Sequence, residues 1–111
     1  MPVNNTYRTF ILGQLAPLVP LRERRMFGCL GLYADDLLFG LVSGDTLYLK
    51  VDQHNLPDYQ AAGVGPFAPY GDKRPMPYYA VPIEVQEDRA ELRAWVEKAV
   101  DAARRRKGRE A

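Results

Sequence analysis

The residue types that most often carry catalysis are scarce in this chain. Its 111 residues include one cysteine, one histidine and one serine, which are Cys29, His54 and Ser43. They allow two nucleophilic arrangements: a Ser43–His54 pair completed by an aspartate, or a Cys29 thiolate with His54 as its base. Ser43 begins a Ser-Gly-Asp turn, and a buried, inert cysteine is commoner than a reactive one. We therefore expect no enzyme and no catalytic residue.

Metal and cofactor sites are equally poorly supported. A zinc site needs about four thiolate or imidazole ligands, which one cysteine and one histidine cannot supply. Four aspartates could supply oxygen ligands for Mg²⁺ or Ca²⁺: Asp35, Asp36, Asp45 and Asp52. Turn propensity explains the first three of these without a metal. The run Gly63-Val64-Gly65 lacks the third glycine and the preceding strand of a phosphate loop. We expect no metal and no cofactor.

Arginines are the stronger functional candidates. Arg24 and Arg25 can bind phosphates or an acidic protein surface through their guanidinium groups, or can tether the chain to nearby acidic residues. A second basic cluster near the C-terminus can add nucleic-acid affinity, or can be a solvated helix end that complements the helix dipole: Arg104, Arg105, Arg106 and Lys107. Residues 29–103 between them contain six basic and twelve acidic side chains, so the body is acidic and both ends are basic.

Aromatic residues offer a further surface. Met26 and Phe27 follow the arginine pair and read as core or interface anchors. Tyr78 and Tyr79 can form an aromatic surface for base stacking, an ordinary outer sheet face, or a dimer interface, together with Tyr33, Tyr48 and Tyr70. The candidate interaction surface therefore comprises Arg24, Arg25, Met26, Phe27, Tyr78 and Tyr79.

The elements that must position these residues centre on an antiparallel meander. Strands are predicted over 30–33, 37–42 and 47–51, separated by the turns Asp35-Asp36 and Ser43-Gly44-Asp45. Gly40 inside the second run predicts a bulge or a close neighbour. Residues 21–25 leave two alternatives open, another helical turn or an extended lead-in. A last strand is predicted over 78–81, ended by Pro82.

Three helices accompany the predicted sheet. The first begins after an Asn4 or Asn5 cap and stops at Ala16, before Pro17. A short middle helix is predicted with Asn55 as its cap, Asp58 at the capping-box position and Gly63 just past its end. The longest runs over 88–107, because apolar residues recur there at helical spacing: Leu92, Trp95, Val96, Ala99, Val100 and Ala103.

Length and pattern fit one α+β domain over residues 1–111, with an antiparallel sheet of four or five strands that contains a three-strand meander and is packed by an N-terminal helix and a long C-terminal helix. Residues 1–4 and 108–111 are expected to be disordered. No apolar run approaches the roughly 20 residues that cross a bilayer, and no signal peptide is visible, so we expect a cytoplasmic protein.

The ordered set of short motifs resembles the N-terminal domain of the TfoX/Sxy family of bacterial competence regulators over about residues 5–105. The matching pieces, in order, are Arg24-Arg25-Met26-Phe27-Gly28, Gly31-Leu32-Tyr33, Leu47 to Asp52, Ala61-Ala62-Gly63, Pro66-Phe67 and Met76-Pro77-Tyr78-Tyr79. Two positions depart from the family pattern: Cys29 stands where a second glycine is usual, and Asp36 stands where the first turn usually has glycine.

The resemblance implies an α+β fold, often dimeric, in a non-enzymatic regulatory or protein-interaction module related to transcription and competence. It implies a homodimer and a protein partner in the transcription machinery. Full-length regulators of the family carry a second, helix-hairpin-helix-like domain, which we do not expect in this chain. The alternatives are direct nucleic-acid binding through the two basic ends and, last, a small-molecule-binding domain or enzyme.

Overall fold

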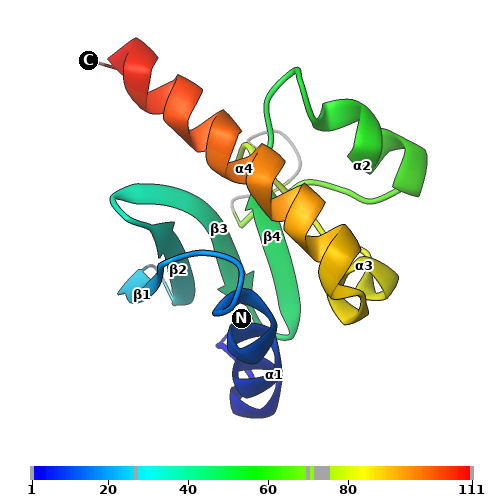
Figure 1. Ribbon diagram of the computed structural model, residues 1–111. Helices are drawn as coiled ribbons and strands as arrows, with labels where there is room; N and C mark the ends of the chain where they lie inside the picture. Colours follow the sequence, from blue (N-terminus) through cyan, green and yellow to red (C-terminus); the bar gives the residue numbers. More distant parts are fainter. Residues whose placement is uncertain (1, 27, 70, 72–75, 111) are drawn as a thin grey trace.

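The computed structural model describes residues 2–26, 28–69, 71 and 76–110. A five-stranded sheet packs against helices (Figure 1), and the strands follow one another across it in chain order. The elements are α1 (Asn5–Leu15), β1 (Leu21–Met26), β2 (Cys29–Ala34), β3 (Leu37–Ser43), β4 (Thr46–Lys50), α2 (Leu56–Ala62), β5 (Tyr78–Ala80), α3 (Ile83–Glu87) and α4 (Arg89–Glu110). The predicted α+β class, meander, N-terminal helix and long C-terminal helix are confirmed.

The open alternative for residues 21–25 is resolved in favour of an extended strand. β1 pairs antiparallel with β2 from Leu21 opposite Ala34 to Met26 opposite Cys29. The turn after β2 places Asp35 at a φ of 56°, a left-handed conformation that aspartate tolerates better than most residues. The predicted Asp35-Asp36 turn therefore forms with an aspartate in the left-handed position.

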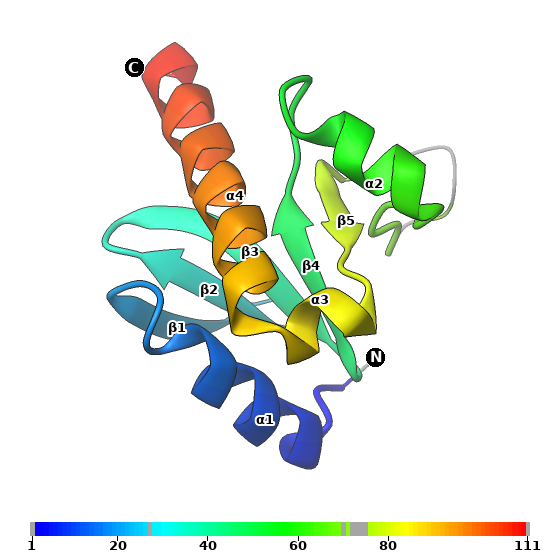
Figure 2. The same cartoon turned by 45° about the vertical axis from the view of Figure 1, so that its right-hand side comes forward.

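The two faces of the sheet differ in what covers them. α1, α3 and α4 lie on one face (Figure 2), which we call the helix face. Leu32, Leu47 and Leu49 point into the core on this face and are fully buried. The opposite, outer face is partly covered by the segment after α2, where the Phe67 ring lies 4.8 Å from the Tyr48 ring. Residues paired across neighbouring strands share a face, so the register assigns each side chain to one of the two.

Because of a bulge in β3, the neighbouring residues Phe39 and Gly40 both lie on the helix face. The register of β2 against β3 shifts between Leu32 and Tyr33, where Leu32 pairs with Gly40 and Tyr33 pairs with Leu38. Phe39 is left between these pairs and is fully buried in the core. A Cβ on Gly40 would lie 2.9 Å from the Tyr48 carbonyl oxygen. The bulge and the close neighbour predicted at Gly40 are both present.

Local signals place the helix ends. Asn4 caps α1, since its Oδ1 accepts a 2.9 Å hydrogen bond from the Tyr7 amide. Asp88 caps α4 by accepting from the Ala90 and Glu91 amides at 3.0 and 3.2 Å. Gly63 ends α2 at a φ of 70°, as predicted.

The prediction for the start of α2 was partly wrong. Pro57 does lie in the first turn, but Asn55 makes no side-chain cap. Its buried amide instead closes the preceding loop: Oδ1 accepts from the Asp52 amide at 2.8 Å and Nδ2 donates to the Lys50 carbonyl at 3.0 Å. The loop offers this side chain two partners, which is why it does not turn toward the helix.

α4 packs its predicted stripe on the sheet. Leu92, Val96 and Ala99 are fully buried, and Trp95 and Val100 are partly buried against the same core. Each large apolar side chain buried here stabilises the fold by about 1.5–3 kcal/mol before entropy. Tyr59 of α2 joins them, with its ring 4.7 Å from the Trp95 ring. α3, which the sequence analysis did not predict, occupies the corner between β5 and α4.

Two further observations concern the chain as a whole. None of the described helices combines the length and the apolar character that crossing a membrane requires. At the ends, the Asn4 amide donates to the Gly44 carbonyl at 2.8 Å and α4 extends to Glu110. The expected disorder of residues 1–4 and 108–111 stays a prediction, and Met1 and Ala111 lie outside the described residues.

Candidate functional site

The two edges of the sheet are not equivalent. At β5, the Phe67 amide donates to the Tyr78 carbonyl at 2.7 Å and the Ala80 amide donates to the Gly65 carbonyl at 3.1 Å, so the preceding loop pairs with this edge. At β1, within the described part of the chain, only β2 contributes backbone hydrogen bonds. β1 is therefore the open edge of the sheet.

The open edge carries mostly charge. The four residues from Arg22 to Arg25 are exposed. Glu23 forms an ion pair with Arg8 of α1. Among the described residues, the side chains of Arg22, Arg24 and Arg25 make no ion pair or hydrogen bond. Charged side chains commonly protect an edge strand from unwanted pairing, and in general charge complementarity contributes to the choice of a partner.

The arginine pair named from the sequence divides between the two faces. Arg24 pairs with Gly31 and Arg25 pairs with Leu30. Leu30 belongs to the core, so Arg25 lies on the helix face and Arg24 lies on the outer face with Arg22. Met26, also on the outer face, lies over Gly31, where an added Cβ would meet its Cε at 2.6 Å. Phe27 lies outside the described residues.

The aromatic half of the candidate surface lies elsewhere. Tyr78 and Tyr79 are on β5, at the opposite edge of the sheet from β1 and roughly 19 Å away, which is four strand spacings. Tyr78 is only 3% exposed, and Lys50 Nζ lies 4.8 Å from its ring centroid. Tyr79 packs on the helix face, 5.7 Å from the Tyr59 ring. Among the five described residues of the proposed surface, the structure therefore does not bring the two tyrosines into one patch with the arginines and Met26.

The C-terminal basic cluster is engaged within the chain. Three of its members form ion pairs, Arg104 with Asp101, Arg105 with Asp52, and Lys107 with Asp36. Arg105 Nε donates to Asp52 Oδ2 at 2.7 Å, and this contact joins α4 to the loop after β4. Arg106 also has an interaction. These contacts favour a structural use of the cluster, and its role in nucleic-acid binding stays a prediction.

The Asp52–Arg105 pair has an electrostatic signature. Burial raises the pKa of Asp52, but the hydrogen bond from Arg105, the hydrogen bond from the His54 amide and the charge of Arg105 outweigh it. The pKa of this carboxyl consequently lies below its ordinary value of 3.8. The ionised pair stabilises the junction of α4 with the sheet at neutral pH.

The nucleophilic arrangements considered above do not form. Ser43 and Cys29 lie at the end of the sheet where β3 ends and β2 begins, and His54 follows β4 at the other end. His54 is exposed, and its amide donates to Asp52 Oδ1 at 2.9 Å. Within the described residues, no three His, Cys, Asp or Glu side chains gather as metal ligands would.

Sequence reasoning missed two arginines of this region. Arg22 belongs to the same charged run as Arg24. Strand alternation would have placed both on one face, but the run of charges hides that alternation in the sequence. Arg8 comes from α1, and no local signal connects it to β1. Its contact with Glu23 depends on how α1 packs.

The architecture defines an α+β domain whose meander sheet is covered by helices on one face and open at β1. The family model described as the TfoX N-terminal domain matches residues 13–103, and the chain belongs to this family. The match confirms the resemblance stated from the motifs. The TfoX N-terminal domain is not a known enzyme family. No curated protein matches the chain.

Proposed function

We propose that this chain is a non-enzymatic regulatory module that binds an extended, acidic segment of a partner protein along β1. The observation that carries the proposal is the open edge of β1 with its unpaired Arg22 and Arg24. An extended segment that adds to a sheet edge gains main-chain hydrogen bonds, and flanking side chains supply selectivity.

The charge of the edge supports an acidic partner over a second copy of this chain. β1 has three arginines and one glutamate, and that glutamate is already paired with Arg8. Pairing β1 with another β1 would bring the arginines of both copies to one seam, where like charges repel. Acidic side chains on a partner strand would instead meet unpaired guanidinium groups.

The biological setting of the proposal comes from the family. Membership in the TfoX N-terminal domain family supports a role in regulating transcription and competence in a bacterial cytoplasm. The partner would then be a component of the transcription machinery. A homodimer, if it forms as the resemblance implies, would use a surface other than β1.

A peptide titration tests the edge. The full chain, labelled with ¹⁵N, is titrated with a short synthetic peptide of alternating valine and glutamate, and with the matching valine and lysine peptide. We expect saturable shifts of the β1 amide signals with the acidic peptide alone. The double variant Arg22→Glu/Arg24→Glu should bind about tenfold more weakly or worse, since it loses two charge-assisted contacts.

The control is the double variant Arg89→Glu/Arg93→Glu, which reverses the charge of two exposed residues of α4. It makes the same total charge change as the β1 variant, but away from β1. It should bind the acidic peptide as the unaltered chain does. Equal weakening in both double variants, or equal binding of the two peptides, would overturn the proposal.

A DNA titration distinguishes the alternative function, direct nucleic-acid binding, from partner binding at β1. The full chain and its Arg24→Ala/Arg25→Ala variant are titrated with duplex DNA over a range of salt concentrations. Direct nucleic-acid binding predicts tight, steeply salt-dependent binding that Arg24→Ala/Arg25→Ala weakens. Such a result, combined with no response to the acidic peptide, would replace the proposed function with nucleic-acid binding.

A further inference from the structure

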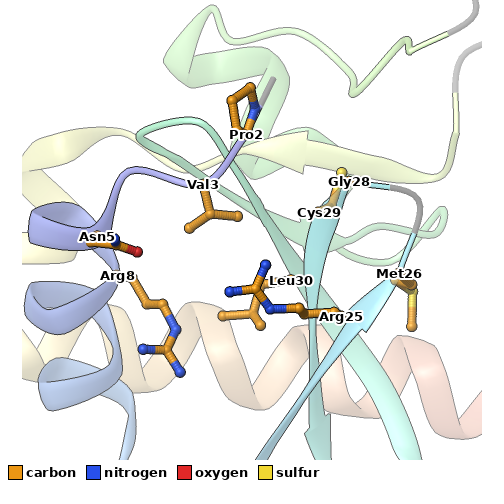
Figure 3. A pocket seen from close by; sticks show the side chains of 9 residues that line it. All are labelled: Pro2, Val3, Asn5, Arg8, Arg25, Met26, Gly28, Cys29 and Leu30. Atoms are coloured by element: carbon orange, nitrogen blue, oxygen red, sulfur yellow. The ribbon is translucent and has the colours of Figure 1, made fainter.

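β1 also borders a pocket, on the face opposite to Arg24. The pocket has a volume of about 750 Å³ and lies between the start of α1 and the β1–β2 hairpin. Arg8 and Asn5 of α1 line one side, and Arg25, Met26 and Leu30 line the other. Figure 3 shows the guanidinium groups of Arg8 and Arg25 entering this space from opposite walls, with Val3 and Leu30 beside them.

The charges in this pocket are unbalanced. Arg8 pairs with Glu23, and within the described residues Arg25 has no partner. One of the two cations on facing walls is thus left without a carboxylate, and the described residues that line the pocket include no acidic side chain. The first turn of α1, which contributes Asn5, also contains no acidic residue, so no negative side chain there offsets the positive end of the helix. An oxyanion between the guanidinium groups would relieve this repulsion.

The rest of the wall is apolar. Val3 packs against the core from the N-terminal segment, and Leu30 is buried at 4% exposure. Met26 borders the pocket at the end of β1, with its side chain on the outer face over Gly31. A ligand held by the arginines would therefore place its remaining atoms against aliphatic side chains, a combination typical of sites for small organic anions.

We propose that this pocket binds a small molecule with a carboxylate or phosphate group on a short apolar body. Arg25 and Arg8 grip the oxyanion, Glu23 holds Arg8 in position, and Val3 and Leu30 contact the apolar body. This site is independent of partner binding at the β1 edge, because Arg25 lies on the helix face and the edge contacts of the proposed function use Arg22 and Arg24.

An NMR titration of the full chain tests the site with three probes: phenyl phosphate, benzoate and inorganic phosphate. We expect saturable shifts of the Gly28, Cys29 and Leu30 amides and of the Arg25 Nε–H signal. At least one probe with a ring should bind about tenfold more tightly than inorganic phosphate, because the ring buries apolar surface. The comparison of phenyl phosphate with benzoate identifies which oxyanion the pocket prefers.

Two variants make the test specific. Arg25→Gln should weaken binding of the preferred probe about tenfold, since one charged contact is lost. Arg24→Gln makes the same charge change one residue away, on the opposite face, and should leave binding unchanged. Arg25 is exposed, and the amide spectrum of each variant reports whether it is folded.

Three results would overturn the proposal. The first is equal weakening by Arg24→Gln and Arg25→Gln, which indicates a general charge effect. The second is shifts that follow the basic residues of α4 and not the pocket. The third is a linear response to all three probes without saturation. None of these results bears on the acidic-peptide titration of the edge, so the two proposals fail separately.

Discussion

Arg24 and Arg25 are neighbours in the chain, yet their side chains lie on opposite faces of β1. Arg24 pairs with Gly31 on the outer face, and Arg25 pairs with Leu30 on the helix face, beside Arg8. A consecutive arginine pair in a strand is therefore two separate groups and not one doubly charged contact. The two proposed sites rest on this division: partner binding at the edge would use Arg24, and ligand binding in the pocket would use Arg25.

The close approach at Gly40 predicts a specific stability cost. Gly40→Ala should lower the free energy of unfolding by about 1–3 kcal/mol, because the new Cβ would lie 2.9 Å from the Tyr48 carbonyl oxygen and 3.1 Å from Leu49 Cδ2. Gly13→Ala is the control: space around its Cβ is open, and alanine favours the interior of α1 by up to about 1 kcal/mol. Urea denaturation measures both, and the two changes should have opposite signs.

Two tyrosine hydroxyls, one buried and one half-buried, predict different effects of the same substitution. Tyr59 is 1% exposed, and its hydroxyl has no hydrogen-bond partner in the described structure. Tyr59→Phe should leave the free energy of unfolding unchanged or raise it, since an unsatisfied polar group is removed. Tyr7 donates to Gln86 Oε1 at 2.5 Å, so Tyr7→Phe should cost about 0.5–1.5 kcal/mol. Thermal unfolding distinguishes them, and a larger loss at Tyr59 would contradict the burial argument.

The Asp52–Arg105 pair predicts a pH-dependent contribution to stability. The folded-state pKa of Asp52 is lowered below 3.8, so its contribution is present above that value and is lost as pH falls through the folded pKa. Asp52→Asn should cost about 1 kcal/mol at neutral pH, a modest amount because solvent partly screens Arg105, and the difference should shrink in acid.

Urea denaturation of both proteins at several pH values measures this difference. The matched control is Asp101→Asn, whose partner Arg104 is more exposed, with 64% of its side chain accessible. This variant should cost less than Asp52→Asn at neutral pH. A difference between Asp52→Asn and the unaltered chain that stays constant into acid would contradict the assignment.

Local patterns predicted the parts of the fold that local chemistry determines. The alternation of Leu47, Leu49 and Val51, the left-handed Gly63 and the apolar stripe of α4 are each readable within a few residues. The sequence did not decide between helix and strand for residues 21–25, because this run of charged residues shows neither the helical nor the strand period. α3 was missed because its five residues, Ile83–Glu87, are too few to show a helical stripe.

The candidate site was less predictable, because it depends on which strands become edges. The motif around Arg24 was visible in the sequence, but only the strand order shows that β1 is the open edge of the sheet. The distance between β1 and β5 also follows from that order. Arg8 reaches Glu23 and the pocket only through the packing of α1, which no short-range pattern encodes.

The family resemblance predicts a homodimer, and the charge of β1 predicts that this strand is not its interface. Size-exclusion chromatography with light scattering should give twice the chain mass of 12.6 kDa. Arg22→Glu/Arg24→Glu should leave that mass unchanged, because the substitutions are at an edge that the dimer does not use. A monomer at high concentration would contradict the first expectation, and a mass changed by the variant would contradict the second.

The central claim is that the chain regulates genes through a partner bound at β1. The most direct measurement compares transcripts in the native host carrying a deletion, the chromosomal Arg22→Glu/Arg24→Glu variant, or the Arg89→Glu/Arg93→Glu control, with protein levels confirmed equal. The account predicts that the β1 variant reproduces the transcript changes of the deletion and that the control matches the unaltered strain. Unaltered transcripts in the β1 variant, alongside clear changes in the deletion strain, would contradict it.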